Sequence, residues 1–431
     1  MRISRLVKMQ YSYHHNTERL SSQAEATAAV CMRNLSNWMP AVDEIRTWPE
    51  YTIQPLRALP NLAHKLGVRE IFVKDESKRF GTGMGSFKAL GAPYSVYRIL
   101  AEEVHAKKGV WPSAAELRTD KYRDITNSVT VCVATDGNQG RGLAYGAKTF
   151  GCHCVDYIHN HVSDGRAKRM MDLGAIVIRI NGEYETSVAR AKEDARMNGW
   201  YFVSSTSWSD FDNDVPQHVM NAYMVVLEEA IALIPQLDRI SHVFVCGGVG
   251  SIAAAIFQGF YTHLRGDKNT PAQLPRFVVV EPLEADCLLQ SAKNGTAYQS
   301  KGTLCTLMAG LACRAPSPAA WKLLNWLASD FLAVPDSIAV EGMKALANGD
   351  EGDIPVVCGE SSAASMGVLL ESVSNSSLRE SLGLDENSQV IIFGLEGATD
   401  PDIYESLVGK SPTTVFEAQD RFHAKACTDL S

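Results

Sequence analysis

The feature that most restricts the fold of this chain is a regular alternation of apolar runs and helical segments that begins near residue 127. Residues 128–135 are rich in β-branched side chains and read as a buried strand, and residues 143–150 read as the helix after its glycine-rich turn. Such alternation predicts βαβ units, and therefore parallel sheets with helices on both faces. We expect further strands at residues 151–159, 175–180, 200–205, 242–246, 275–282 and 388–397, and helices at residues 163–173, 184–199, 215–231 and 252–260.

Three glycine-rich turns follow apolar runs in this pattern, at residues 81–91, 137–142 and 247–251. Right-handed crossovers place all strand-to-helix turns of a parallel sheet at the same edge. Ligands of such sheets bind outside the carboxyl ends of the strands, which is where these turns lie. The sequence therefore predicts an α/β protein with a ligand site formed by its glycine turns.

Charge and cysteine content exclude several classes of partner. The formal net charge of −8 argues against nucleic acid and against an anionic membrane, because phosphate binding needs a basic face. No apolar run approaches the roughly 18 residues of a membrane span. The ten cysteines are scattered and several lie in apolar runs, which is typical of reduced, buried thiols in the cytoplasm. We therefore expect a cytoplasmic protein whose partners are small molecules.

The first glycine turn ends in a single lysine, Lys88, within the stretch F-G-T-G-M-G-S-F-K-A-L-G (residues 80–91). One interpretation is a simple turn, in which Lys88 opens a helix and keeps its ammonium group in water. The other is that the lysine is buried beside a cofactor that needs its amine, because a neutral amine is the nucleophile in Schiff-base chemistry. The residues of this turn alone leave both interpretations open.

The third glycine turn, C-G-G-V-G-S, lies between an apolar strand and an alanine-rich helix, which predicts a phosphate cradle. A tight turn without a ligand is the plainer interpretation. A dinucleotide site is a further alternative, because Gly248, Gly250 and Ala253 match G-x-G-x-x-A and Glu281 closes the next strand. Glu281 lies further along the chain than the usual spacing of about 20 residues, so this motif alone decides nothing.

The second glycine turn, A-T-D-G-N-Q-G-R-G (residues 134–142), carries an acid, an amide and an arginine. Asp136 in a desolvated cleft could act as a base. The structural alternative is a helix N-cap or an Asx-turn, which is the commoner use of an aspartate at such a position.

A metal site is not expected. Cys152, Cys154, His159 and His161 are four potential ligands within ten residues, but their spacing matches none of the common zinc patterns.

Several blocks, taken in order, identify a family. The stretches K-D-E-S-K-R-F-G and S-F-K-A-L-G precede A-T-D-G-N-Q-G-R-G-L-A, V-E-P-L-E-A-D-C, T-L-M-A-G-L-A-C, G-E-S-S-A and L-E-G-A-T-D. In this order they resemble the tryptophan-synthase-β-like (fold type II) pyridoxal-phosphate enzymes, and most of all the diaminopropionate ammonia-lyases. The resemblance covers about residues 45–410 and implies pyridoxal 5′-phosphate as the cofactor.

The resemblance implies a role for each turn. Lys88 stands where the family's lysine forms the Schiff base with the cofactor aldehyde, Phe87 would pack near the ring, and Asn138 stands where an asparagine binds the ring hydroxyl. Asp136 stands where an aspartate removes the Cα proton of the D-isomer. The phosphate loop would consist of Gly247, Gly248, Val249, Gly250 and Ser251, and the substrate would meet Ser86, Thr135, Asp136 and Ser205.

The implied reaction is an α,β-elimination, in which a small β-substituted amino acid such as diaminopropionate yields a 2-oxo acid and ammonia. A β-replacement synthase, or a racemase or epimerase, is the alternative that keeps the cofactor. A non-catalytic relative of the fold and a nicotinamide oxidoreductase are alternatives of other classes.

Two positions depart from the family's pattern. Where the family carries Q-D-T-A-W, with an aspartate that serves the L-isomer, this chain reads S-S-T-S-W, and Ser205 takes the aspartate's place. A serine hydroxyl is a far weaker base than a carboxylate, so the change favours a D-directed enzyme, proton removal by Lys88 itself, or another substrate. At the end of the last strand, Gly394 and Leu395 stand where the family has the Ser or Thr that binds the pyridine nitrogen, and Glu396 is the nearest candidate in sequence.

The length of 431 residues suggests at least two domains, and the resemblance implies how they are divided. We expect an N-terminal extension over residues 1–44 and a large cofactor-binding domain formed by residues 45–95 and 212–410. A small α/β domain would span residues 96–211, and residues 411–431 would form a C-terminal tail. The active site would lie between the two domains, and the family implies a homodimer.

Overall fold

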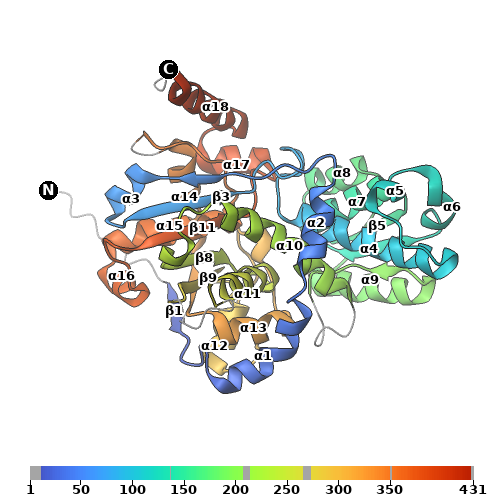
Figure 1. Cartoon of the computed structure of the whole chain (residues 1–431), viewed down its shortest axis with the longest axis horizontal. Coiled ribbons are helices and arrows are strands. Elements are labelled where there is room, and N and C mark those ends of the chain that lie inside the picture. Colours follow the sequence, from blue (N-terminus) through green and yellow to red (C-terminus); the bar gives the residue numbers. More distant parts are fainter. Residues whose placement is uncertain (1–10, 136, 207–213, 266–272, 350–351, 429–431) are drawn as a thin grey trace.

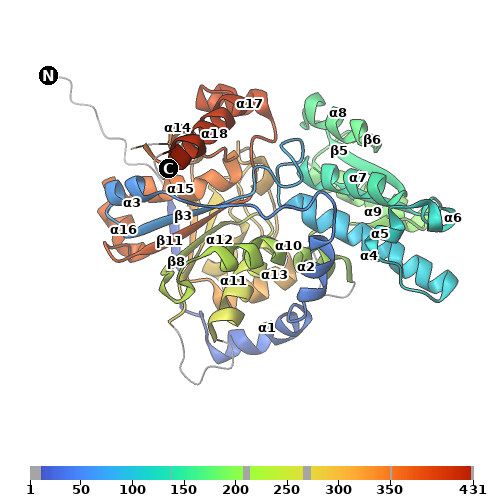
Figure 2. The ribbon, with the colours of Figure 1, turned by 45° about the horizontal axis from the view of Figure 1, so that its top comes forward.

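The computed structural model describes residues 11–135, 137–206, 214–265, 273–349 and 352–428 (Figure 1). Its strands form two sheets, one of seven strands and one of four. Both views of the ribbon place the four-stranded sheet and its helices to one side of the larger sheet (Figures 1 and 2). The predicted α/β fold with parallel sheets is confirmed.

The seven strands of the large sheet follow the order β1-β10-β9-β8-β11-β3-β2. Neighbours from β10 to β3 run parallel, whereas β1 and β2 pair antiparallel at the two edges. Every residue of β8, β10 and β11 is buried, as is typical of parallel strands covered by helices on both faces. The strands are β1 (Ser12–His15), β2 (Leu56–Ala58), β3 (Glu70–Asp75), β8 (His242–Cys246), β9 (Arg276–Pro282), β10 (Asp330–Val334) and β11 (Gln389–Gly394).

The four strands of the small sheet are all parallel and follow the order β6-β5-β4-β7. The strands and helices predicted here are confirmed, with two shifts of boundary. Strand β7 has only two residues, and α7 begins at Asn138, within the glycine turn. The elements are β4 (Thr130–Ala134), β5 (His153–His159), β6 (Ile176–Ile180), β7 (Tyr201–Phe202), α7 (Asn138–Phe150), α8 (Asp164–Asp172) and α9 (Tyr184–Asn198).

The described residues form fifteen further α-helices. In the first half of the chain they are α1 (Ser22–Asn34), α2 (Met39–Arg46), α3 (Pro60–Leu66), α4 (Lys88–Lys108), α5 (Ala114–Leu117), α6 (Arg123–Thr126) and α10 (Asp214–Leu233). In the second half they are α11 (Ser251–Arg265), α12 (Cys287–Asn294), α13 (Pro318–Leu327), α14 (Asp336–Asn348), α15 (Glu360–Ser374), α16 (Ser376–Leu382), α17 (Pro401–Val408) and α18 (Pro412–Thr428).

Helices α4 and α7 touch at their backbones, and this contact places Lys88 next to the glycine turn of the small sheet. A Cβ atom at Gly142 would lie 2.7 Å from the carbonyl oxygen of Lys88, and one at Gly146 would lie 2.7 Å from Cα of Pro93. A side chain cannot approach the backbone so closely, so both positions need glycine. The first residue of α4, Lys88, therefore lies beside the first turn of α7, which carries Asn138.

A buried network of two cations and two anions anchors the chain just before the Lys88 turn. Nζ of Lys74 lies 2.8 Å from a carboxylate oxygen of both Glu76 and Glu229. Arg79 lies 2.7 Å from the same two acids. Burial raises the pKa of Glu76, but the positive charges of Arg79 and Lys74 have the larger effect and lower that pKa to about 2. Each buried charge has an opposite partner, so the network ties this segment to α10 without leaving an unpaired ion.

Described residues from both predicted end segments contact the large sheet or the segment that follows β3. Tyr13 in β1 donates a hydrogen bond of 2.7 Å to Asp330 in β10, so residues predicted as an N-terminal extension supply an edge strand. In the predicted tail, α18 lies near Lys78, whose Nζ is 4.5 Å from the ring centroid of Phe416. The boundaries of the two domains stay a prediction. No helix of the described residues is long and apolar enough to cross a membrane.

Candidate active site

A large cavity opens at the carboxyl ends of strands from both sheets. It encloses about 1190 Å³, counted out to its open mouth. Its walls come from the start of α4, the end of β4 and start of α7, the segment after β7, the turn after β8, residues 309–313, the start of α15 and Glu396. The site is thus where the glycine turns predict it.

Nine of the predicted site residues line this cavity. Ser86 and Gly250 lie one residue away from lining residues, and Asp136 lies outside the described residues. The roles of all of them stay predictions. The nine are Phe87, Lys88, Thr135, Asn138, Ser205, Gly247, Gly248, Val249 and Ser251.

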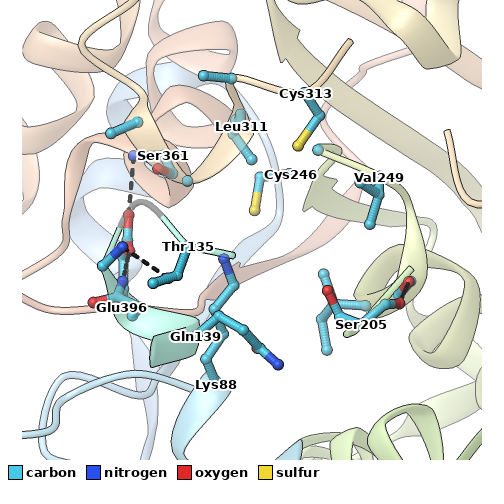
Figure 3. A pocket seen from close by; sticks show the side chains of 18 of the residues that line it. Lys88, Thr135, Gln139, Ser205, Cys246, Val249, Leu311, Cys313, Ser361 and Glu396 are labelled. Atoms are coloured by element: carbon cyan, nitrogen blue, oxygen red, sulfur yellow. Dashed lines mark hydrogen bonds between the residues drawn. The ribbon is translucent and has the colours of Figure 1, made fainter. Parts of the chain in front are cut away.

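Lys88 is half-buried in the wall of the cavity, so its side chain does not simply extend into bulk water. Its Nζ lies 5.8 Å from the ring centroid of Phe87, which in turn packs against Tyr223 at 4.7 Å between centroids. Figure 3 shows Lys88, Gln139 and Cys246 among the side chains that line the cavity. The tertiary structure therefore favours the interpretation in which the lysine faces a ligand.

Asn138 is held by charged groups from both sheets. Its Nδ2 donates a hydrogen bond of 2.9 Å to Oε2 of Glu396, and its Oδ1 accepts one of 3.3 Å from Arg141. Oε1 of Glu396 accepts the backbone N–H of Ser361 at 3.3 Å, and Figure 3 shows both contacts of Glu396. Burial lowers the pKa of Arg141 to about 10, with further lowering by Arg169 and Arg166. These contacts fix the plane of the Asn138 amide at the cavity wall.

The turn before α7 is shaped by Thr135. Its Oγ1 accepts hydrogen bonds of 3.0 Å from the backbone N–H groups of both Gly137 and Gly140. The side chain of Thr135 therefore stabilises the turn, as in an ST-turn. The conformation brings Gly137, Asn138 and Gln139 to the cavity wall.

The glycine turn after β8 forms a cradle of backbone at the start of α11. Gly248 and Gly250 have φ values of 67° and 94°, which L side chains rarely adopt. A Cβ at Gly247 would lie 2.6 Å from Cγ of Glu281. Ser251 opens α11 and donates its hydroxyl to the carbonyl of Ser205 at 2.7 Å. A glycine turn that ends at a helix N-terminus is a favourable place for a phosphate group.

Glu281 does not support a dinucleotide site. Its carboxyl is fully buried and accepts the backbone N–H groups of Leu288 and Leu289 at 2.9 and 2.7 Å. Burial is the main cause that raises its pKa to about 8. The side chain caps the start of α12 and packs beneath Gly247, so the acid that a ribose would need lies below the turn.

Several lining residues were not singled out from the sequence. Both side-chain polar atoms of Gln139, the hydroxyl of Ser361 and the hydroxyl of Tyr223 are buried and lack a hydrogen-bond partner among the described residues. Buried polar groups are normally paired, so three such groups around one cavity fit a site that receives a polar ligand. Gln139 and Ser361 lie inside blocks that carry the family resemblance, whereas Tyr223 lies within the predicted helix 215–231 and has no such signal.

A hydroxyl from another element lies next to the end of β11, where Gly394 and Leu395 stand. Oγ of Ser362, in the first turn of α15, accepts the backbone N–H of Leu395 at 3.0 Å and lines the cavity. Glu396, the candidate by sequence proximity, has both carboxylate oxygens engaged by Asn138 and Ser361. The hydroxyl of Ser362 is therefore better placed than Glu396 to donate a hydrogen bond to a ligand near the end of β11.

The cavity fits pyridoxal 5′-phosphate, since it combines an amine, a phosphate cradle and unpaired buried polar groups. Residues 47–393 match the model of the family described as pyridoxal-phosphate-dependent enzymes. The chain belongs to this family, with the type II fold, and its cofactor is pyridoxal 5′-phosphate.

Diaminopropionate ammonia-lyases resemble this chain over most of its length. Diaminopropionate ammonia-lyase of Escherichia coli (strain K12) is 32% identical over 366 residues, which cover 83% of this chain and 87% of the relative. The enzyme of the same name from Salmonella typhimurium is 32% identical over 404 residues, 92% of this chain and 97% of the relative. The crystal structure of the Escherichia coli enzyme in complex with D-serine is 29% identical, with a TM-score of 0.78 and coverage of 93% of this chain and 97% of that one.

Proposed function

We propose that this protein is a pyridoxal-phosphate-dependent lyase that carries out α,β-elimination on a small β-substituted amino acid and releases a 2-oxo acid and ammonia. Its proposed substrates are D-diaminopropionate and D-serine. The likeness to diaminopropionate ammonia-lyases and to the complex with D-serine supports this choice. The single observation that carries the proposal is one cavity lined by Lys88, Asn138 and four residues of the glycine loop, Gly247, Gly248, Val249 and Ser251.

On the cofactor side, Lys88 would hold the aldehyde carbon through its amine, and the glycine loop with the start of α11 would hold the phosphate. Asn138, fixed by Glu396 and Arg141, would donate to the ring hydroxyl. The hydroxyl of Ser362 would face the pyridine nitrogen. When bound, pyridoxal phosphate spreads the negative charge that proton removal leaves on the substrate carbon.

On the substrate side, Asp136 is the proposed base for the Cα proton of a D-amino acid. The adjacent turn, shaped by Thr135, would present Gly137 to Gln139 to the substrate carboxylate. The unpaired carboxamide of Gln139 would supply a donor for it. Orientation of this kind lowers the barrier by fixing the reacting bond relative to the base.

The proposed selectivity for the D-isomer rests on residues 204–206, which form another part of the cavity wall. Residues 204–206 line the cavity as Ser204, Ser205 and Thr206, so this segment offers hydroxyls and no carboxylate. The carbonyl of Ser205 is engaged by Ser251. Removal of the Cα proton of an L-isomer would then depend on a weak base or on Lys88.

The decisive experiment follows pyruvate release from the D- and L-isomers of diaminopropionate and serine with a coupled lactate dehydrogenase assay. We expect turnover of the D-isomers, little of the L-isomers, and a loss of about 100-fold or more in Asp136→Asn. Asp402→Asn, an exposed aspartate of α17, is the control and should keep full activity. Cα proton exchange without pyruvate would point to a racemase, and product formation only with an added nucleophile would point to a synthase.

We also propose that the enzyme works in the cytoplasm as a homodimer. The nine cysteines placed in the described residues form no disulfide with one another, and most are buried, which suits a reducing compartment. The dimer is proposed from the family alone. Light scattering after size-exclusion chromatography tests it, since a mass of twice 47.1 kDa is expected.

A further inference from the structure

Glu360 is an acidic residue of the cavity wall that has no role in the proposed binding of cofactor and substrate. Among the described residues that line the cavity, the acidic side chains are Glu360 and Glu396. Both oxygens of Glu396 are occupied by Asn138 and Ser361. Glu360 instead makes a long contact, with Oε1 at 3.9 Å from Nη2 of Arg166. Glu360 is therefore the carboxyl with hydrogen-bonding capacity left for a ligand.

The position of Glu360 combines burial with access to the substrate turn. The residue is 8% exposed and is the first residue of α15. Arg166, on α8 across the cavity, packs over the second glycine turn, since a Cβ at Gly137 would lie 3.4 Å from its Cδ. Glu360 thus lies at the end of the cavity near Gly137, where the proposed substrate would bind.

Its surroundings favour a carboxyl that is neutral at rest and can become charged during a reaction. Burial raises the pKa of Glu360 to about 8, with Glu396 and Asp400 acting in the same direction and Arg166 in the opposite one. After proton loss, Arg166 and the N-terminus of α15 would stabilise the new carboxylate. These are the properties of a general acid.

We propose that Glu360 is the proton donor to the leaving β-substituent, a role that rests on the proposed elimination. The electron pair left by removal of the Cα proton becomes the Cα–Cβ double bond. The bond from Cβ to the heteroatom breaks, its electron pair stays on the heteroatom, and that atom takes the proton from the Glu360 carboxyl. A β-hydroxyl then leaves as water, and the Glu360 carboxylate remains beside Arg166.

The test compares leaving groups that do and do not need a proton. In Glu360→Gln, kcat for D-serine should fall by about 100-fold or more, because hydroxide is a poor leaving group. The rate with β-chloro-D-alanine should stay within about threefold, because chloride leaves without protonation. Glu405→Gln, an exposed glutamate of α17, should leave both rates unchanged. An equal loss with both substrates, or no loss with D-serine, would overturn the proposal.

Three further readouts separate a chemical role from a structural one. Deuterium exchange at Cα of D-serine should continue in Glu360→Gln, since the acid acts after proton removal. Glu360→Asp, which keeps a carboxyl, should retain more activity on D-serine than Glu360→Gln does. In the cofactor-free protein, the infrared difference between wild type and Glu360→Gln near pH 6 should show a protonated carboxyl; a carboxylate signal there would contradict the proposal. Failure of the wild type to release pyruvate from any of these substrates would instead refute the proposed function.

Discussion

Nδ2 of Asn138 donates a hydrogen bond of 2.9 Å to Oε2 of Glu396, and this contact joins the first turn of α7 to the residues just after β11. Asn138 comes after β4 of the small sheet, and Glu396 comes after β11 of the large sheet. The two sheets are thereby coupled at the cavity wall, at the residue proposed to bind the cofactor ring.

We expect Glu396→Ala to weaken cofactor binding by about 10- to 100-fold, because a hydrogen bond to a charged group contributes about 1.5–3 kcal/mol. Glu396→Gln keeps one acceptor and should lose less. Titration of the cofactor-free protein with pyridoxal phosphate, followed by absorbance, measures the change. Unchanged affinity in Glu396→Ala would show that Asn138 keeps its orientation without this bond.

Replacing Lys88 tests the covalent link directly. Lys88→Ala should lose the visible absorbance of the Schiff base and the label fixed by borohydride, because the remaining side chain has no amine. Lys78→Ala removes a lysine ten residues earlier, beside Phe416, and should keep both signals. Mass spectrometry of the reduced protein locates the label. A label found on another lysine would contradict the assignment.

The contact between α4 and α7 should tolerate no side chain at Gly142. Gly142→Ala would place Cβ 2.7 Å from the carbonyl oxygen of Lys88, and the forced separation should cost about 1–3 kcal/mol. Gly165→Ala in α8 is the matched control, since its added Cβ would meet no atom within 4 Å. It should be neutral or stabilising by up to about 1 kcal/mol. Urea unfolding measures the stability of both variants. Equal stabilities of Gly142→Ala and Gly165→Ala would argue against the close contact between α4 and α7.

Asp156 should make stability depend on pH in the direction opposite to most carboxylates. Burial raises its pKa to about 8, so the folded state keeps a proton that the unfolded state releases near pH 4. Its stabilising contribution is present at low pH and is lost as the pH rises towards 8. Asp156→Asn should therefore gain stability relative to wild type between pH 5 and pH 8, by at least about 1 kcal/mol.

Urea unfolding at several pH values measures this difference. Asp420→Asn, in an exposed position of α18, should show no such trend. A difference between wild type and Asp156→Asn that stays constant with pH would mean that Asp156 is ionised in the folded protein.

Much of the scaffold was readable from local pattern. The alternation of β-branched runs with helical segments predicted β4 to β6, β8, β9 and β11 close to their observed ends. The glycine turns predicted where a ligand would bind, and Lys88, Asn138, residues 247–249 and Ser251 do line one cavity. Such predictions succeed because side-chain periodicity and glycine conformation are properties of neighbouring residues.

Other features depend on residues that are far apart in the chain. Strand β1 pairs with β10, more than 300 residues later, and nothing near Tyr13 indicates that partner. Tyr223 reads as a core residue of a helix, yet it lines the cavity, and its buried hydroxyl has no hydrogen-bond partner among the described residues.

The chain's local chemistry thus specified a parallel α/β scaffold, a lysine at one glycine turn and a second glycine turn at the start of a helix. The fold in three dimensions added the start of α15, whose Glu360, Ser361 and Ser362 reach the cavity only because that helix packs beside the end of β11. Periodicity reports which face of an element is buried but not which distant element covers it. That choice depends on the complementary shapes and charges of the packed layers.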